Sequence, residues 1–485
     1  MHMKVLHTVR SILLAVLVLM LVSACATNPV TGRPQLALSE SWGKTAGAEY
    51  HQEILKQYQI YDDPQLQNYI DEIGQRLVAK SHRPDLPFKF TLLDSPEVNA
   101  FALPGGYVYV TRGIMAYMSK ESHLAGVIGH EIGHVTARHG AQRAAQQQAA
   151  GIAAIGVAIA TGSNELAQAS QLLGGALMSG YGREQELQSD RLGAEYIAKN
   201  NYDVDEMLGV IGILKNQELF AAEKAAAEGR EHQSYHGLFS THPNNDKRLK
   251  EVIKAADKFR DISQPIPDDG RFLRMTNGMA FGSSESQGII RGNKFYHKDL
   301  DLFVEFPDQW QIVNQATQLL AVSPDSTQGI IIKHESVQSG TSPSQYLSNV
   351  YDSFRNGQNI SNVNGNAYGG LATLTDAETS QQADIRVSSL YRGNQNFIIQ
   401  GLGKDNLPDR EFYSVVQAVR GLKSNEKKLA TGNHIQLVTA KRGDTFAKLA
   451  QSSGLTDYAE AQLRLINNMY PSGEPTAGQQ IKIIK

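Results

Sequence analysis

The chain has 485 residues, a formal net charge of −3, and 41% hydrophobic and 20% charged residues. A chain of this length and composition is expected to fold into two or three globular domains. It has no basic run, so nucleic acid is not an expected partner. Its single cysteine, Cys25, excludes a disulfide within the chain.

The first 24 residues have the pattern of a bacterial lipoprotein signal peptide. Lys4 and Arg10 form a basic start, and the apolar run over 12–22 is too short to span a bilayer comfortably. Small residues precede Cys25 as in a lipobox, so lipid attachment at Cys25 is predicted. An ordinary secretory signal with an incidental cysteine is the alternative. Because residue 26 is alanine rather than aspartate, the expected location is the periplasmic side of the bacterial outer membrane, with the lipid as the membrane anchor.

A strand is predicted shortly before the most informative motif. Residues 107–111 are β-branched or aromatic, and a Pro-Gly-Gly turn at 104–106 precedes them. A helix is expected to follow. A plain hairpin in the core would explain this pattern equally well.

The segment 129–135 contains the spacing of a zinc-binding helix. His130 and His134 lie four residues apart, so on a helix they share one face and their nitrogens can reach one Zn²⁺ at roughly 2.0–2.1 Å. Glu131 lies about 100° further round the helix, where its carboxylate can take a proton from a zinc-bound water. The spacing therefore predicts one zinc ion per chain and a metal-dependent peptidase with Glu131 as its catalytic base.

The alternative is an accidental match in a core helix. Apolar residues over 121–143 recur at helical spacing, which suits either interpretation. Gly129 and Gly133 favour the metal site, because a glycine inside a helix costs about 1 kcal/mol relative to alanine and needs a packing or functional reason. They also predict that another backbone approaches this helix. Other histidines, among them His123 and His139, are interpreted as ordinary residues without a role in the site.

A second helix is predicted to complete the site. The segment 183–191 is rich in carboxylates, and Glu186 is the predicted third metal ligand. Asp190 lies four residues later on the same face, so it is predicted to accept the free ring N–H of one of the two histidines and so orient it. An ordinary charged turn that faces solvent is the alternative.

The chain is predicted to have an α+β multidomain fold. A mainly helical peptidase domain with a small substrate-aligning β-sheet is followed by an α+β module and by a C-terminal β-α-α-β module. Short alternating strands and helices near 343–356 and 408–423 are expected in the α+β module. The predicted parts are a signal peptide (1–24), the zinc peptidase domain (25–262), a linker (263–290), the α+β module without a catalytic motif (291–423), a second linker (424–433) and the C-terminal module (434–485).

Four segments together resemble a known family. They are 99–113, 129–135, 183–193, and 241–243 with Arg248. These segments are similar to gluzincin zinc metallopeptidases of the CAAX-prenyl-protease/HtpX type, in the periplasmic BepA-like lipoprotein branch. The resemblance covers roughly residues 30–260, and no catalytic position departs from the family pattern.

The resemblance implies roles that spacing alone does not. His242 would be the histidine of a mobile loop that caps the zinc and holds the enzyme latent, or moves away to open it. Arg248 would help to stabilise the tetrahedral oxyanion. Asn99, Ala100 and Phe101 would form the edge strand that aligns an extended substrate. Without the resemblance, His242 is interpreted as a surface histidine in a turn.

The last fifty residues resemble a LysM module. The matching features are the segments 441–450, 463–468 and 477–483. Such modules bind glycans that contain N-acetylglucosamine, so the resemblance implies peptidoglycan as a partner. A module that retains the fold but has lost glycan binding is the alternative.

The sequence is compatible with three functions for the whole chain. The first is a periplasmic zinc endopeptidase whose substrates are misfolded, stalled or misassembled envelope proteins. The alternative is a chaperone-like factor that acts with the outer-membrane protein assembly machinery and whose peptidase site is normally latent. The third, a peptidoglycan-bound scaffold with an inactive peptidase fold, is disfavoured because a scaffold has no need of the carboxylate of Glu131.

Overall fold

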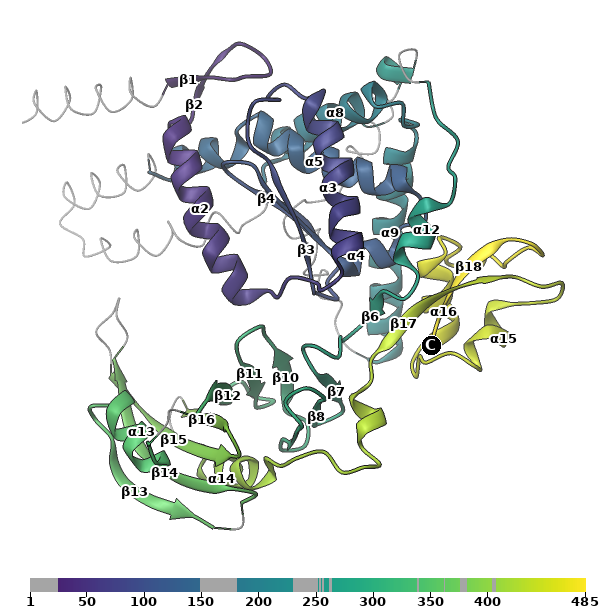
Figure 1. Cartoon of the computed structure of the whole chain (residues 1–485). Helices are drawn as coiled ribbons and strands as arrows, with labels where there is room; N and C mark the ends of the chain where they lie inside the picture. Colours follow the sequence, from purple (N-terminus) through teal and green to yellow (C-terminus); the bar gives the residue numbers. More distant parts are fainter. Residues whose placement is uncertain are drawn as a thin grey trace, which may run out of the picture. The chain divides into compact units, whose positions relative to one another are not determined.

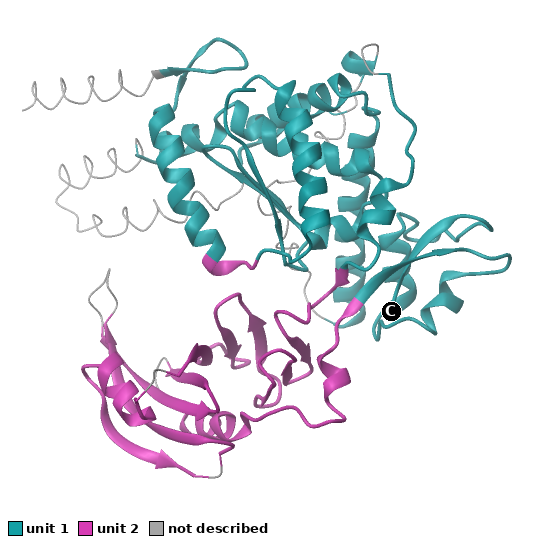
Figure 2. Ribbon diagram, in the orientation of Figure 1, with its two compact units in different colours: residues 1–55, 60–279, 434–485 teal, residues 56–59, 280–433 magenta. Residues whose placement is uncertain are grey.

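The structure, a computed structural model, describes residues 25–148, 181–229, 252, 254, 257–260, 264–337, 340–361, 363–375, 382–403 and 407–485. The chain divides into two compact units (Figure 2): unit 1 comprises residues 1–55, 60–279 and 434–485, and unit 2 comprises residues 56–59 and 280–433. The predicted α+β multidomain fold class is confirmed. Residues 434–485, predicted as a module beyond a linker, belong to the same compact unit as the peptidase segment.

Unit 1 combines helices with a small three-stranded sheet (Figure 1). Its elements up to residue 279 are β1 (Cys25–Thr27), β2 (Pro34–Leu36), α2 (Glu40–Gln57), α3 (Pro64–Ala79), β3 (Lys89–Leu93), β4 (Ala100–Leu103), β5 (Tyr107–Thr111), α4 (Arg112–Tyr117), α5 (Glu121–Thr136), α8 (Arg183–Lys199), α9 (Glu206–Ala227) and α12 (Arg271–Thr276). Residues 139–148 are also helical. None of the helices in the described ranges is both long enough and apolar enough to cross a bilayer.

The sheet of unit 1 has the order β3-β5-β4, so β4 lies at an edge. β5 has the bounds predicted for the strand at 107–111 and occupies the centre, where it pairs in parallel with β3 and antiparallel with β4. Its β-branched and aromatic side chains suit a strand that is covered on both faces. The Pro-Gly-Gly turn joins β4 to β5, and Gly105 and Gly106 both have positive φ, which glycine adopts without steric cost.

The C-terminal part of unit 1 has the predicted order of strand, helix, helix, strand. Its elements are β17 (Asn433–Thr439), α15 (Phe446–Ala450), α16 (Ala459–Ile466) and β18 (Gln480–Ile484), and β17 pairs antiparallel with β18. This part packs on the segment that leads into α5. The side chain of Lys482 on β18 is buried and donates hydrogen bonds to the carbonyl oxygens of Ala116 and Met118 at 2.5 and 2.7 Å.

Unit 2 is built on a seven-stranded antiparallel sheet in the order β10-β11-β12-β16-β15-β14-β13. The helix α13 covers one face through Tyr346 and Leu347, and α14 covers the other through Phe412 and Val415. Its elements are β6 (Ala280–Phe281), β7 (Ile289–Arg291), β8 (Lys294–His297), β9 (Leu302–Glu305), β10 (Gln311–Asn314), β11 (Leu319–Val322), β12 (Gln328–Ser336), α13 (Pro343–Val350), β13 (Arg355–Ile360), β14 (Asn366–Thr375), β15 (Gln382–Arg392), β16 (Gln395–Gly403), α14 (Asp409–Ala418) and the short 3₁₀ helix η1 (Lys427–Ala430).

Candidate metal centre

The two predicted site helices, α5 and α8, pack closely against each other. A Cβ atom added at Gly133 would lie 3.1 Å from Cα and from the carbonyl oxygen of Ser189, and one added at Gly129 would lie 3.4 Å from Cα of Gly193. The glycines of α5 therefore allow the backbone of α8 to approach, as predicted. This close approach brings side chains of α8 to the histidine face of α5.

Three predicted ligands meet where these helices cross. One donor atom from each of His130, His134 and Glu186 lies within 4.8 Å of the others, and all three residues are buried. The two histidine Nε2 atoms are 3.0 Å apart, and each lies 3.5 Å from an oxygen of Glu186. Two nitrogens bound to one tetrahedral zinc at about 2.05 Å would be roughly 3.3 Å apart. The group therefore fits a zinc ion after shifts of a few tenths of an ångström.

Asp190 lies behind His130, on the side of the ring away from the other ligands. Its Oδ1 is 2.9 Å from Nδ1 of His130, which leaves Nε2 of that ring directed to the metal position. Burial opposes a charged imidazolium here, but hydrogen bonds and charge interactions with Asp190 and Glu186 outweigh it and raise the pKa of His130 to about 10.

His139, which the sequence interpretation passed over, lies behind the second histidine. Its Nδ1 is 2.9 Å from Nδ1 of His134 and its Nε2 is 3.0 Å from Oε1 of Gln188. The ring is fully buried, and burial lowers the pKa of His139 to about 4, so the ring is neutral. The spacing of His134 and His139 does not by itself reveal this contact, because it depends on the turn that follows α5.

Tyr181 is a second residue near the site that the sequence did not indicate. Its ring stacks on His134 at a centroid distance of 3.8 Å, and the guanidinium carbon of Arg143 lies 4.8 Å from the centroid of the Tyr181 ring. The phenol donates a hydrogen bond of 3.4 Å to the carbonyl oxygen of Ala102 on β4. Tyr181 thus links a candidate metal ligand to the edge strand.

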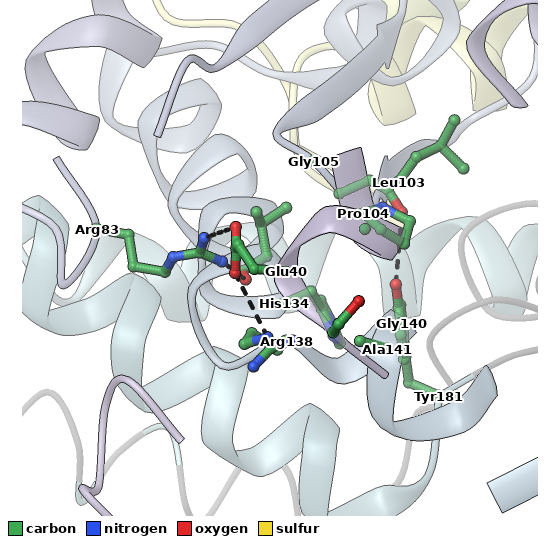
Figure 3. A pocket seen from close by; sticks show the side chains of 14 residues that line it. Glu40, Arg83, Leu103, Pro104, Gly105, His134, Arg138, Gly140, Ala141 and Tyr181 are labelled. Carbon is green, nitrogen blue, oxygen red and sulfur yellow. Dashed lines mark hydrogen bonds and ion pairs between the residues drawn. The ribbon is translucent and has the colours of Figure 1, made fainter. Parts of the chain in front are cut away.

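A shallow hollow opens beside His134 and Tyr181 (Figure 3). The residues Leu103, Pro104 and Gly140 form part of its wall, and Glu40 makes ion pairs with Arg83 and Arg138 at its side. The hollow therefore joins a candidate metal ligand to the end of the edge strand.

The predicted substrate-aligning residues lie at this edge strand. The N–H of Thr111 donates to the carbonyl of Asn99 at 3.1 Å, so the backbone of Asn99 faces β5. Because bonding alternates along an antiparallel pair, the backbone groups of Ala100 and Ala102 point to the open edge, whereas those of Phe101 face β5. The side-chain Oδ1 of Asn99 is buried and makes no hydrogen bond, which is costly unless a bound group supplies a donor.

Of the remaining predicted site residues, the structure describes some and not others. Glu131 lies on α5 beside His130 and is 1% exposed. Cys25 begins β1. His242, Arg248 and the predicted signal peptide (1–24) lie outside the described residues.

Comparisons with known proteins agree with this site. Residues 64–256 match the family model of peptidase family M48. We call residues 64–256 the M48 domain, after the family model that they match. The M48 domain contains the ligand cluster and the edge strand, and the predicted resemblance to gluzincin zinc metallopeptidases is confirmed. The LysM-like resemblance stays a prediction.

Three relatives illustrate the similarity of the chain. The beta-barrel assembly-enhancing proteases of Yersinia pestis and Escherichia coli (strain K12) are 31% and 29% identical over 241 and 235 residues, which are 47% and 46% of this chain and 46% and 45% of those proteins. The mitochondrial metalloendopeptidase OMA1 of Schizosaccharomyces pombe is 30% identical over 186 residues, which are 38% of this chain and 51% of that protein. The chain thus spans about half the length of the curated relatives that it matches.

Proposed function

We propose that the protein is a zinc-dependent endopeptidase. The observation that carries this proposal is the buried group of His130, His134 and Glu186 on two crossing helices. Glu131 lies next to this group, and β4 is the nearby edge strand among the described strands of its sheet. Two imidazoles and one carboxylate form a ligand set that suits zinc and leaves a fourth position for water or substrate.

The residues of the M48 domain would divide the work of hydrolysis. When bound, zinc supplies a Lewis acid that polarises the scissile carbonyl and makes a water molecule more acidic. Glu131 takes a proton from that water and then delivers it to the leaving amine. Asp190 holds the ring of His130 in place, and Arg248 is proposed to stabilise the negative charge that develops on the carbonyl oxygen.

The edge strand β4 would hold the substrate in an extended conformation. The outward N–H and carbonyl groups of Ala100 and the outward N–H of Ala102 offer hydrogen bonds to an added antiparallel strand, whereas the carbonyl of Ala102 accepts from Tyr181. The buried Oδ1 of Asn99 would accept a further hydrogen bond from a substrate N–H. Because β4 and the ligand cluster both border the space around Tyr181, a peptide on this edge would pass close to the metal. An enzyme of this design cleaves within chains that can become extended.

We further propose that the substrates are proteins of the bacterial envelope that are misfolded or stalled. The support is the match to relatives named beta-barrel assembly-enhancing proteases and the lipobox before Cys25. The chain would be anchored by a lipid at Cys25 on the periplasmic side of the outer membrane, and the LysM-like residues 434–485 would add a contact with peptidoglycan.

A casein digest tests the enzymatic proposal. The purified protein loaded with zinc should cleave casein, and Glu131→Gln should bind zinc but lose cleavage, because an amide cannot act as the base. His130→Ala should lose both zinc and cleavage. Full zinc content in His130→Ala would show that the assigned ligands are wrong, and undiminished cleavage by Glu131→Gln would remove its role as the base.

The second candidate is a chaperone-like factor that assists outer-membrane protein assembly with its peptidase usually latent. The names of the relatives favour it, and His242 would be the residue that caps the metal. Cells that produce only Glu131→Gln should retain normal levels of folded outer-membrane barrels if assistance is independent of cleavage, and lose them if it is not. In a latent enzyme, His242→Ala should cleave casein faster than the wild type, whereas a role of His242 in the transition state predicts slower cleavage.

A further inference from the structure

A short chain of hydrogen bonds lies behind His134, at the ring nitrogen that does not face the ligand cluster. It runs from Nδ1 of His134 to Nδ1 of His139 at 2.9 Å, and from Nε2 of His139 to Oε1 of Gln188 at 3.0 Å. His134 and His139 are both buried, at 1% and 0% exposure. Water therefore has little access to the shared Nδ1 atoms, and the protein itself must satisfy them.

The position of each proton in this chain follows from the metal site. His134 directs Nε2 to the ligand cluster, so that nitrogen must be free of hydrogen when it binds a metal, and the ring proton must lie on Nδ1. Nδ1 of His134 then donates, and Nδ1 of His139 accepts. The proton of His139 is left on Nε2, where the carbonyl oxygen of Gln188 accepts it. The hydroxyl of Ser189 lies further from Nδ1 of His139, at 3.3 Å, so His134 is the nearer donor to the one lone pair of this nitrogen.

From this geometry we infer that His139 is a positioning residue for the metal site, which fixes the tautomer and the ring orientation of His134. This inference rests on the proposed zinc site. His139 would act on the metal only through His134, and Gln188 would hold His139 in the tautomer that can accept.

One helix supports both histidines of the cluster, but with different chemistry. α8 supplies Asp190 directly to His130 at 2.9 Å, and Gln188 to His134 through His139. A carboxylate makes the ring of His130 more electron-rich, whereas a neutral imidazole accepts the proton of His134 without adding negative charge. Because Glu186 on the same helix is the third ligand, any movement of α8 changes all three supports of the site together.

Replacement of His139 separates this role from ordinary packing. His139→Phe fills the space but has no acceptor, so Nδ1–H of His134 loses this partner. His139→Asn keeps an acceptor oxygen close to the position of Nδ1. His123→Phe is the matched control, because His123 is also buried and bonded, through Nε2 to Glu206 at 2.8 Å, but belongs to the opposite end of α5. Gln188→Leu removes the second link of the chain.

The measurements are the zinc dissociation constant, by competition with a chromogenic chelator, and the visible spectrum of the cobalt-substituted protein. Loss of a residue that supports a metal ligand typically weakens metal binding by about 10–100-fold. We expect a loss of this size and a changed cobalt spectrum in His139→Phe, a smaller loss in Gln188→Leu, and recovery towards wild type in His139→Asn. His123→Phe should bind zinc as the wild type does, whatever its effect on stability.

Each outcome bears on a different part of the argument. Wild-type zinc affinity and an unchanged cobalt spectrum in His139→Phe would overturn the positioning role and leave the zinc site intact. If His139→Phe does not fold, wild-type zinc affinity together with a wild-type cobalt spectrum in Gln188→Leu would overturn it equally. Undiminished zinc binding in His130→Ala would instead overturn the proposed zinc site.

Discussion

The buried amine of Lys482 makes the stability of unit 1 depend on pH in a predictable direction. Burial lowers the pKa of Lys482 to about 7 from its ordinary value of 10.5. A neutral amine still has two hydrogens, which are enough to donate to the carbonyls of Ala116 and Met118. The folded protein therefore favours the neutral form, whereas the unfolded chain keeps the proton up to a pH near 10.5.

The sign and size of the effect follow from this difference. Between about pH 7 and pH 10.5 the unfolded chain carries a proton on Lys482 that the folded chain lacks, so the free energy of unfolding rises with pH in this window. Within this window, each pH unit adds about 1.4 kcal/mol to the free energy of unfolding. The full shift corresponds to about 5 kcal/mol, of which about 3 kcal/mol falls between pH 7 and pH 9.5. Stability is lost again as the pH falls towards 7.

Urea unfolding at pH 7 and at about pH 9.5 measures this contribution. The wild type should gain about 3 kcal/mol more than Lys482→Met between the two pH values, because methionine fills the space without an ionisable group. Lys485→Met is the matched control, since Lys485 is on the surface and should keep the wild-type pH dependence. Equal pH dependence in the wild type and Lys482→Met would refute the reasoning.

Three further predictions concern the M48 domain. Gly133→Ala should weaken zinc binding and should not raise the free energy of unfolding, because its Cβ would lie 3.1 Å from Ser189. Gly212→Ala on α9 is the control: its Cβ would have no atom within 4 Å, so its free energy of unfolding should rise by about 1 kcal/mol. Equal gains for the two variants in urea unfolding would contradict the close packing of α5 and α8. Asp94→Ala should lower the free energy of unfolding by about 3–5 kcal/mol in the same assay, because it removes the carboxylate that lies 2.5 Å from the buried guanidinium of Arg112. A loss below about 1 kcal/mol would argue against a structural ion pair. Removal of zinc by a chelator should lower the midpoint of thermal unfolding. The loss in the free energy of unfolding is about 4 kcal/mol if the free zinc concentration had exceeded the dissociation constant about 1,000-fold. An unchanged midpoint would argue that zinc does not bind the folded state.

The sequence predicted those parts of the fold that depend on local spacing. Two histidines four residues apart on an apolar helix must share a face, and the structure places both on α5. The strand predicted at 107–111 has the observed bounds of β5. The helix predicted near 343–356 ends earlier, at Val350, because the chain turns there and β13 begins at Arg355.

Contacts between distant segments were harder to predict. Lys482 meets Ala116 and Met118 more than 360 residues earlier in the chain, and no periodic pattern connects them. Tyr181, which lies just before α8, contacts His134 and Ala102. No spacing in the sequence predicts the partner of a stacked ring or of a buried amine, because that partner depends on how the folded chain packs.

The sequence by itself determined the helix with its zinc-binding spacing, the second helix with its carboxylates, and the position of Glu131 next to His130, because these follow from residue types and from helical periodicity. Only the tertiary structure decided how closely α5 and α8 approach, which nitrogen of each histidine faces the metal, and that His139 and Gln188 stand behind His134. These features depend on side chains brought together by folding across gaps of tens of residues. Their hydrogen bonds are set by three-dimensional packing in a site with little access to water, which local sequence does not encode.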